Sequence, residues 1–448
     1  MKKSVLKLIS IVLFCLTVLN YGRQASLAIN KDEENVRRGI GLGTTTLYIS
    51  GAYRIRGEVQ DNFNVKAYGT GIEEDYVISR LRLHLDLHLP NAVQFFTEIQ
   101  DAEVLGVSFN DSDFSPNNNP YHDPFDINKA FIAIKPVKGI ELKVGRQSIS
   151  FGDRMIFGPG DWGNTGRYAW DAVLLRFDNE YINSNWLVGR YIIHDPDRWP
   201  NKHVAGPTAY ATYSTVKKLP FVLDVFYVLK TDSRGVTKGE KGSGNLSSNS
   251  LGFRIDGQLD RWDYGSTVVS QFGNWGTDEI RAYGLAFHLG YTFNMAWRPH
   301  LIAQYVKGSG DKKPNDGKHN TFDGVFGGSD TILYGWMNLF FWPNLQEHRL
   351  DLVLTPVQNT TFRLEYHYFR LDEAKDAWYY PGKAQRVDHS GSSGRELGHE
   401  LDFSVRKRVS NHLELLGGYS FFIPGEFIKN TGKSPKAHWY FLETTFNF

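Results

Sequence analysis

The stretch that decides the fold is Tyr76–Leu89, YVISRLRLHLDLHL. From Leu81 to Leu89 every second residue is leucine, and polar residues such as Arg82 and Asp86 stand between the leucines. A period of two predicts a β-strand with one apolar and one polar face. Strands of soluble sheets usually run about five or six residues, whereas a tilted strand that crosses a membrane needs about 9 to 11. The stretch therefore predicts a membrane-spanning strand.

The same alternation recurs along the chain. The predicted strands are joined alternately by tight turns and by long polar segments. Outer-membrane barrels have this sidedness, with short turns on the periplasmic side and long loops outside. Eight tight turns connect nine strand pairs, so the predicted fold is all-β: a transmembrane antiparallel β-barrel of about 18 strands. Sixteen strands remain an alternative, because residues 331–347 and 184–215 give the weakest strand signals. The turns are Pro90-Asn91, Pro136–Gly139, Asp178–Ser184, Lys217–Pro220, Asp260–Trp262, Phe293–Trp297, Pro356–Thr360 and Ser410-Asn411.

The predicted long loops are polar segments rich in glycine, asparagine and aspartate, which favour turns and irregular structure. They cover residues 61–75, 106–126, 151–168, 194–206, 231–248, 308–330 and 373–393.

The N-terminus predicts export. Lys2, Lys3 and Lys7 precede an apolar run from Leu8 to Leu19, and the small residues around Ala28 suit cleavage, so residues 1–28 are a predicted cleaved signal peptide. The run is shorter than the ~20 residues that a membrane-spanning helix needs. Residues 29–45 are then a periplasmic N-terminal lead-in and residues 46–448 the barrel. The expected location is the cell outer membrane, crossed many times.

Composition excludes several classes of chemistry. The only cysteine, Cys15, lies in the signal segment, so the mature chain has no disulfide or thiol chemistry. The mean hydropathy of −0.38 suits a barrel, in which every second strand residue faces water. Removing the four positive charges of the signal segment changes the net charge from +1 to −3. The short basic runs at 312–313 and 406–408 do not support nucleic-acid binding.

The last strand, His438–Phe448, alternates and ends in Phe446-Asn447-Phe448. A terminal aromatic residue on an amphipathic strand is typical of an outer-membrane barrel. Tyrosines and tryptophans near the strand ends fit the aromatic girdles that such barrels place at both membrane interfaces.

The phase of each strand predicts which charges face the lumen, because an arginine or lysine on the lipid face costs about 2 to 4 kcal/mol at the midplane. Arginines concentrated at a constriction would favour anions. The alternative is that they pair with acids on adjacent strands as structural ladders. The side chains with inward phase are Arg54, Arg56, Glu58, Arg80, Arg82, His84, Asp86, Gln94, Glu98, Gln100, Lys129, Glu141, Lys143, Arg176, Arg254, Asp256, Arg363, Glu365, His367, Glu400, Asp402 and Arg406.

Several motifs, in order along the chain, resemble the alginate export family of outer-membrane barrels. The resemblance implies a monomeric barrel of eighteen strands whose arginine-rich lumen conducts an anionic polysaccharide outward, with long loops gating either mouth. It makes Arg146 a lumen residue of the selectivity region and matches Arg363, and Glu400 with Asp402, to family positions. The motifs are Gly145-Arg146-Gln147, Phe151–Arg154, Asp161–Asn164, Arg167, Trp170–Ala172, His319–Gly324, Tyr334-Gly335, Tyr366–Leu371, Asp376–Tyr379, Leu397–Asp402 and Gly418–Gly425.

The expected function is therefore a channel for an anionic polysaccharide or another anionic solute, in contact with outer-membrane lipid and with a periplasmic export partner. A diffusion porin for small anionic or polar nutrients is the alternative in the same compartment. A lipid-hydrolysing barrel would need a Ser/His dyad, for which no motif appears, and an adhesion barrel would need a filled lumen. We expect no catalytic residues and no cofactor. The acidic loop around Asp111, His122 and Asp123 has oxygen ligands that suit Ca²⁺, but turn composition explains it as well.

Overall fold

The computed structural model describes residues 38–114, 118–158, 160, 162–166, 169–327, 334–380 and 383–448. The predicted signal peptide, the first part of the lead-in, and Asp161 and Arg167 of the motifs lie outside the described residues. No helix among the described residues is long and apolar enough to cross a membrane.

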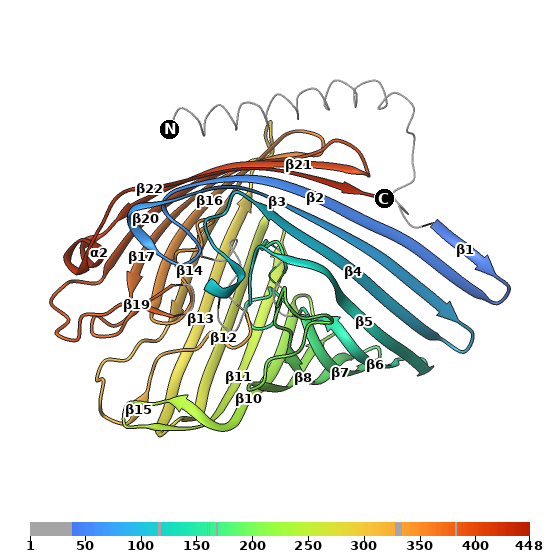
Figure 1. Ribbon diagram of the computed structural model, residues 1–448, viewed down its shortest axis with the longest axis horizontal. Coiled ribbons are helices and arrows are strands. Elements are labelled where there is room, and N and C mark those ends of the chain that lie inside the picture. The colour runs from blue at the N-terminus through green and yellow to red at the C-terminus, as the bar shows by residue number, and fades with distance from the viewer. Residues whose placement is uncertain are drawn as a thin grey trace.

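Within the described part of the chain, eighteen strands form one closed antiparallel wall, in which each strand pairs with its neighbour in sequence. The ring closes because the first strand of the wall, β2, pairs with the last, β22, over Ala52–Asp61. Figure 1 shows this seam between the blue and the red strand. The wall strands are β2 Thr45–Phe63, β3 Tyr68–Leu89, β4 Val93–Leu105, β5 Asp123–Val137, β6 Ile140–Ser148, β7 Ala169–Asp178, β8 Ile182–Tyr191, β9 Thr208–Val216, β10 Val222–Lys238, β11 Ser243–Leu259, β12 Trp262–Trp275, β13 Asp278–Thr292, β14 His300–Gly308, β16 Leu345–Val357, β17 Thr360–Leu371, β20 Glu396–Arg408, β21 Leu413–Pro424 and β22 Ala437–Asn447.

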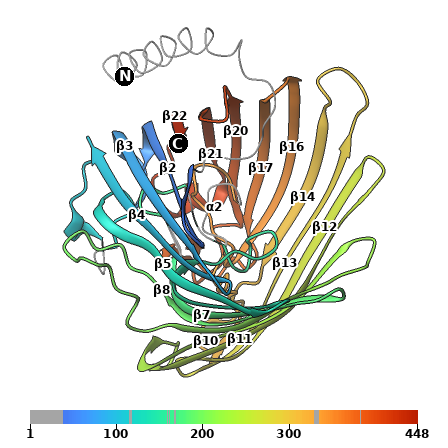
Figure 2. The ribbon, with the colours of Figure 1, turned by 90° about the vertical axis from the view of Figure 1, so that its right-hand side faces the viewer.

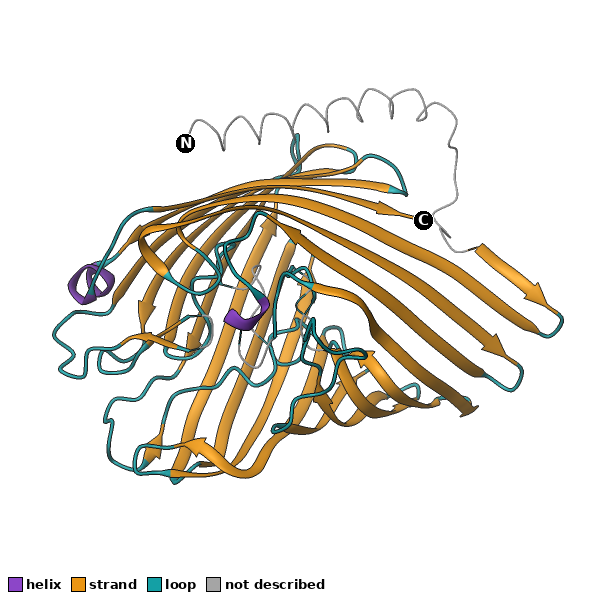
Figure 3. Cartoon of the chain, in the orientation of Figure 1, coloured by secondary structure: helices purple, strands orange, loops and turns teal. Residues whose placement is uncertain are grey.

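The predicted barrel and its eighteen strands are confirmed. Each of the eight predicted tight turns separates two consecutive antiparallel strands, and these turns gather at the end of the barrel that also carries the C-terminus. We call this the short-turn end, and the opposite end the long-loop end. In the part of the chain that the structure describes, the helical elements are the short η1 (Asp111–Asp113) and α2 (Glu426–Thr431), both in long-loop connections (Figure 3).

Residues 331–347 gave one of the two weakest strand signals, and in the described part of this segment only the last three residues belong to a strand. The wall strand β16 begins only at Leu345, and residues 334–344 form no strand. Leu339, Phe340 and Trp342 are fully buried. Their apolar side chains pack inside the barrel instead of facing lipid, which composition alone cannot distinguish.

Most residues of two predicted loops, 61–75 and 231–248, belong to strands instead. β2 and β3 are separated by residues 64–67 only, and β10 and β11 by residues 239–242. Here the strands continue past the apolar belt with polar residues on both faces. The loss of alternation therefore marks the edge of the membrane and not the end of the strand.

The two ends of the barrel sequence meet at the seam. β1 (Arg38–Leu42), in the predicted lead-in, forms a hairpin with Thr45–Ile49 of β2. The last residue is fixed by two backbone hydrogen bonds, from Gly51 N to Phe448 O at 2.7 Å and from Phe448 N to Gly51 O at 2.9 Å. The terminal aromatic residue is thereby part of the closed wall.

The outer surface carries the apolar face of the alternating strands. Leu83 and Leu85 of β3, Phe253 of β11 and Leu289 of β13 are each 38 to 50% exposed. Figure 2 shows the tilted strands side by side in the wall. Such a belt is what lipid requires, since no water is present there to hydrate charges.

We predict that Leu83→Arg places a charge in this belt and costs about 2 to 4 kcal/mol of stability in lipid. The mutant should fold less completely into bilayers, measured as the heat-modifiable folded fraction on gels. Leu83→Val is the matched control and should fold like the wild type. Equal folding of the arginine variant would contradict the assignment of this face to lipid.

Candidate functional site: the lumen and its inward loops

Three long-loop connections fold into the barrel and carry buried aromatic residues. They follow β6, β14 and β17, and they include the short strands β15 (Lys318–His319), β18 (Trp378–Tyr379) and β19 (Ala384–Arg386). Phe157, Phe326 and Trp378, one from each connection, are at most 2% exposed and belong to one cluster with wall residues such as Phe226 and Val269. The long-loop half of the lumen therefore contains a packed core.

The wall strands β2 and β3 present a basic group to the first of these loops. Arg54 and Arg80, directly opposite each other in the register, both donate to the carbonyl of Gly163, at 3.0 and 3.2 Å. Arg56 donates to the carbonyl of Trp162 at 2.9 Å, and its guanidinium lies 3.9 Å from the centroid of that indole ring. The loop is thus held against the wall by predicted lumen arginines.

These cations also have acidic neighbours. Arg56 pairs with Glu58 at 2.7 Å and with Glu443 at 3.1 Å, and Arg54 lies 3.7 Å from Glu443. Such ladders between adjacent strands are the alternative that the sequence left open.

The next part of the wall repeats this arrangement around a single carboxylate. Glu98 of β4 lies 3.5 Å from Arg82, 2.9 Å from Lys129 and 2.8 Å from His84. Two cations and a histidine therefore share one acid, so this sector keeps an excess of positive charge when combined with the arginines of β2 and β3.

Strands β16, β17 and β20 carry the opposite balance. Arg363 contacts Asp351 at 3.2 Å and Glu365 at 3.4 Å, and both acids also pair with Arg349. Glu347 and Glu400 are fully buried in the same sector. The predicted site residues Arg363 and Glu365 therefore belong to a mixed, mainly acidic cluster.

The carboxylates of this cluster hold the second inward loop. Glu400 accepts a hydrogen bond from the backbone N–H of Met337 at 2.8 Å. Asp402 accepts one from the N–H of Trp336 at 3.2 Å, and Glu365 accepts the indole N–H of Trp336. The predicted Glu400 and Asp402 thus satisfy loop backbone groups that have no strand partner, as buried polar groups require.

A second set of contacts, from strands β10 and β12, holds the same connection, which follows β14. Lys230 of β10 lies 2.9 Å from Asp323, which also accepts from the side chain of Gln271 at 2.6 Å. Both partners of the ion pair are nearly buried, with 14% and 8% of their side chains exposed. Burial alone would raise the pKa of Asp323, but the charge of Lys230 and these hydrogen bonds lower it below its ordinary value.

Two predicted site residues lie near the short-turn end. Arg176 contacts Glu141 at 3.5 Å, and Arg406 pairs with Glu414. Both arginine side chains are about half exposed. They sit on the wall away from the inward loops, so the structure does not bring them together with the basic group of β2 and β3.

Arg146 is nearly buried at the long-loop end of β6, and its place in the selectivity region stays a prediction. The register of β6 has no shift between Val144 and Arg146, but Gly145 between them has a φ of 126°. Val144 is 45% exposed on the outer face. Arg146 pairs with Asp171 at 3.0 Å and with the buried Asp126 at 3.5 Å.

The acidic side chains considered as Ca²⁺ ligands contact other protein groups instead. Asp111 lies 3.1 Å from His122, while Asp123 contacts His194 at 2.8 Å and the amide of Asn201 at 2.9 Å. Among the described residues, no group of three or more metal-ligating side chains is arranged to hold an ion.

Strand phase does not find the loop side of these contacts, because Trp162, Trp336 and Asp323 act from irregular segments. Trp162 and Asp323 stand in the motifs Asp161–Asn164 and His319–Gly324, but the resemblance gave them no role. The available signal was the apolar run from Tyr334 to Trp342, which is too aromatic for a solvent-exposed loop.

A closed antiparallel barrel with an apolar belt, a charged lumen and inward loops is a porin-like channel of the outer membrane. Three solved structures share the fold: OccD3 (OpdP) of Pseudomonas aeruginosa, OccAB2 of Acinetobacter baumannii and OccK11 (OpdR) of P. aeruginosa. Their TM-scores are 0.59, 0.59 and 0.55, and their sequence identities 11%, 10% and 12%. The alignments cover 93%, 89% and 89% of this chain and 94%, 98% and 96% of theirs.

The chain belongs to the alginate export family, whose sequence pattern matches residues 46–440. A search of the curated proteins found no match. The protein is thus an outer-membrane channel of this family and not an enzyme.

We predict that Lys230→Met loosens the second inward loop. The substitution leaves the Asp323 carboxylate buried without its cation, which costs about 3 to 5 kcal/mol locally. Single-channel recordings should show larger or more frequent openings, and limited proteolysis should cut between residues 309 and 344. Lys230→Arg, which keeps the charge, should behave like the wild type. Unchanged currents and proteolysis in the methionine variant would show that the ion pair does not hold the loop.

Proposed function

We propose that this channel conducts an anionic polysaccharide or another anionic solute outward across the outer membrane. It acts as a monomer and receives its substrate from a periplasmic export partner. Membership of the alginate export family supports an anionic glycan as the substrate class. The cleaved signal peptide over residues 1–28 remains part of this proposal, as does the barrel boundary at residue 46.

The observation that carries the proposal is the basic sector of the wall. Arg54, Arg56, Arg80, Arg82 and Lys129 come from strands β2, β3 and β5 and have the phase that faces the lumen. Four carboxylates lie among them: Glu58, Asp86, Glu98 and Glu443.

The balance matters because charges act strongly in a narrow pore. Two unit charges 4 Å apart interact by about 1 kcal/mol in water and about 4 kcal/mol at an effective dielectric of 20. The Debye length is about 8 Å at physiological ionic strength, so a passing carboxylate feels this sector across much of a constricted lumen. An excess of positive charge there favours anions over cations.

The diffusion porin for small solutes is the second candidate, and the acidic sector on β16, β17 and β20 favours it. There Glu347, Asp351, Glu365, Glu400 and Asp402 outnumber their basic partners. A path along this side would not select anions. The choice between the anion channel and the diffusion porin depends on which sector, basic or acidic, borders the open path.

We predict that the wild-type channel in a planar bilayer with a salt gradient has an anion-selective reversal potential. Arg82→Glu should reduce or invert this selectivity, because it replaces a cation of the basic sector by a second anion beside Glu98. Lys218→Glu, in the exposed short turn between β9 and β10, makes the same charge change outside the wall strands and should leave selectivity nearly unchanged.

Cation selectivity of the wild type would reject the anionic substrate. Equal shifts in both variants would attribute the effect to net charge and not to the basic sector. Either result would move the assignment to the diffusion porin.

A further inference from the structure

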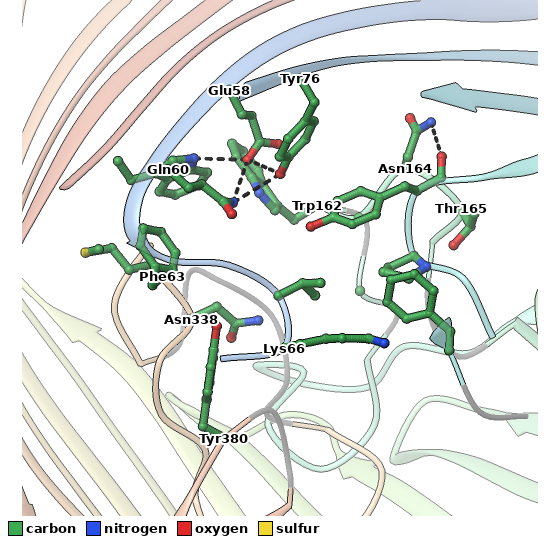
Figure 4. Close-up of a pocket in the computed structure, with 18 of the residues that line it drawn as sticks. Glu58, Gln60, Phe63, Lys66, Tyr76, Trp162, Asn164, Thr165, Asn338 and Tyr380 are labelled. Carbon is green, nitrogen blue, oxygen red and sulfur yellow. Dashed lines mark hydrogen bonds between the residues drawn. The ribbon is translucent and has the colours of Figure 1, made fainter. Parts of the chain in front are cut away.

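A cavity of about 600 Å³ lies in the long-loop half of the lumen, beside the basic sector. Its volume falls within the range of roughly 300 to 1,000 Å³ that is typical of small-molecule sites. The wall strand β2 contributes Arg56, Glu58 and Gln60, and the inward loops contribute Trp162, Asn338 and other residues. Figure 4 shows Glu58, Gln60, Trp162 and Asn338 around one common space.

Much of the lining is aromatic. Tyr76, Tyr121 and Tyr380 line the cavity together with Trp162 and Trp336. Trp162 is the least buried of the lining tryptophans that the structure describes, and its ring packs edge to face against Trp336 at 5.4 Å. Arg56 lies over one face of this ring, 3.9 Å from the centroid, so stacking concerns the other face. Flat apolar faces of this kind stack against the C–H face of a sugar ring, which is apolar although the ring edge carries hydroxyls.

The charges at the base of the cavity are already compensated. Glu58 pairs with Arg56 at 2.7 Å and accepts hydrogen bonds from Tyr76 at 2.7 Å and from the indole N–H of Trp439 at 3.0 Å. This wall therefore has little charge to offer a ligand. Recognition here depends on hydrogen bonding and stacking.

One polar group remains available. Asn338 has a partly exposed carboxamide, and the structure gives that side chain no hydrogen-bond partner among the described residues. In Figure 4 the carboxamide points into the cavity on the side of Lys66. An amide offers two donors and an acceptor, which match the adjacent hydroxyls of a sugar. Lys66 also lines the cavity, with its ammonium 4.6 Å from the centroid of the Phe114 ring. The ammonium donates one hydrogen bond to the carbonyl of Asp113, and its two other N–H groups can serve a ring carboxylate.

The backbone at Asn338 fixes where this amide points. Its φ of 55° lies in the left-handed region, which asparagine tolerates better than most residues. The flanking Trp336 and Met337 are held by Asp402 and Glu400 through their backbone N–H groups. The amide is thus preorganised by the same contacts that anchor the loop.

We propose that this cavity is a subsite for one sugar ring of a glycan chain, bound by the Asn338 amide and stacked against Trp162. The proposal rests on the proposed function for the presence of a glycan in the lumen. The subsite lies next to Arg56 on the long-loop side, so a chain leaving the basic sector meets it before the outer mouth.

The test is calorimetric titration of the full-length protein in detergent with two probes, an oligouronate and neutral maltohexaose. We expect saturable binding of the oligouronate, and weaker binding of maltohexaose because it lacks the carboxylate for Lys66. Asn338→Gly removes the amide at a position where glycine adopts the same φ without strain, and it should raise the Kd about five- to tenfold. Trp162→Leu should raise it about tenfold or more.

Asn359→Gly is the matched control, since Asn359 has a φ of 58° in the short turn between β16 and β17, away from the cavity. It should bind like the wild type. No saturable binding of either probe to the wild type, or unchanged affinity in both cavity variants, would overturn the proposal.

The reversal potential separates this test from that of the proposed function. An anion-selective pore that binds neither probe keeps the proposed function and overturns the subsite. A cation-selective pore whose sugar binding both variants weaken overturns the proposed function and supports the subsite.

Discussion

The structure depends on one constraint: inside a lipid bilayer every backbone N–H and C=O must find a partner in the protein. A sheet meets this condition only when it has no free edge, so the pairing of β2 with β22 and the fixing of Phe448 to Gly51 make the rest possible. Closure also sorts the side chains. Leu83 and Leu85 face lipid, so Arg82, His84 and Asp86, which alternate with them, face the other side of the wall.

The enclosed charges then determine what the lumen can hold. They are too close to one another to stay independent, so most of the predicted arginines contact carboxylates on neighbouring strands. The same polar groups satisfy the backbone of the inward loops: Arg54 and Arg80 bind the carbonyl of Gly163, and Glu400 and Asp402 bind the N–H groups of Met337 and Trp336. Selectivity and loop position are therefore coupled, and changing a wall charge alters both.

The sequence was sufficient to predict the strands of the barrel wall, but not the arrangement of the loops inside the lumen. Period-two alternation and turn residues predicted eighteen strands and all eight tight turns, because both signals are local. The orientation of Glu400 and Asp402 followed from the same phase. For Arg146 the family motif and the phase of Val144 disagree, and the position in the selectivity region stays a prediction. The apolar run from Tyr334 to Trp342 gives only a weak strand signal, and a segment buried in the lumen is as apolar as one facing lipid. Its true place depends on contacts with β17 and β20 that are distant in sequence.

Residues 334–344 form part of a packed core inside the barrel, anchored by Glu365, Glu400 and Asp402. Hydrogen–deuterium exchange of the protein in lipid nanodiscs measures this packing. Amides from Trp336 to Trp342 should exchange as slowly as those of the flanking wall strands in the wild type, and far faster in Asp402→Asn. Fast exchange of this segment in the wild type would contradict this packing, because the loop would then not be part of the core.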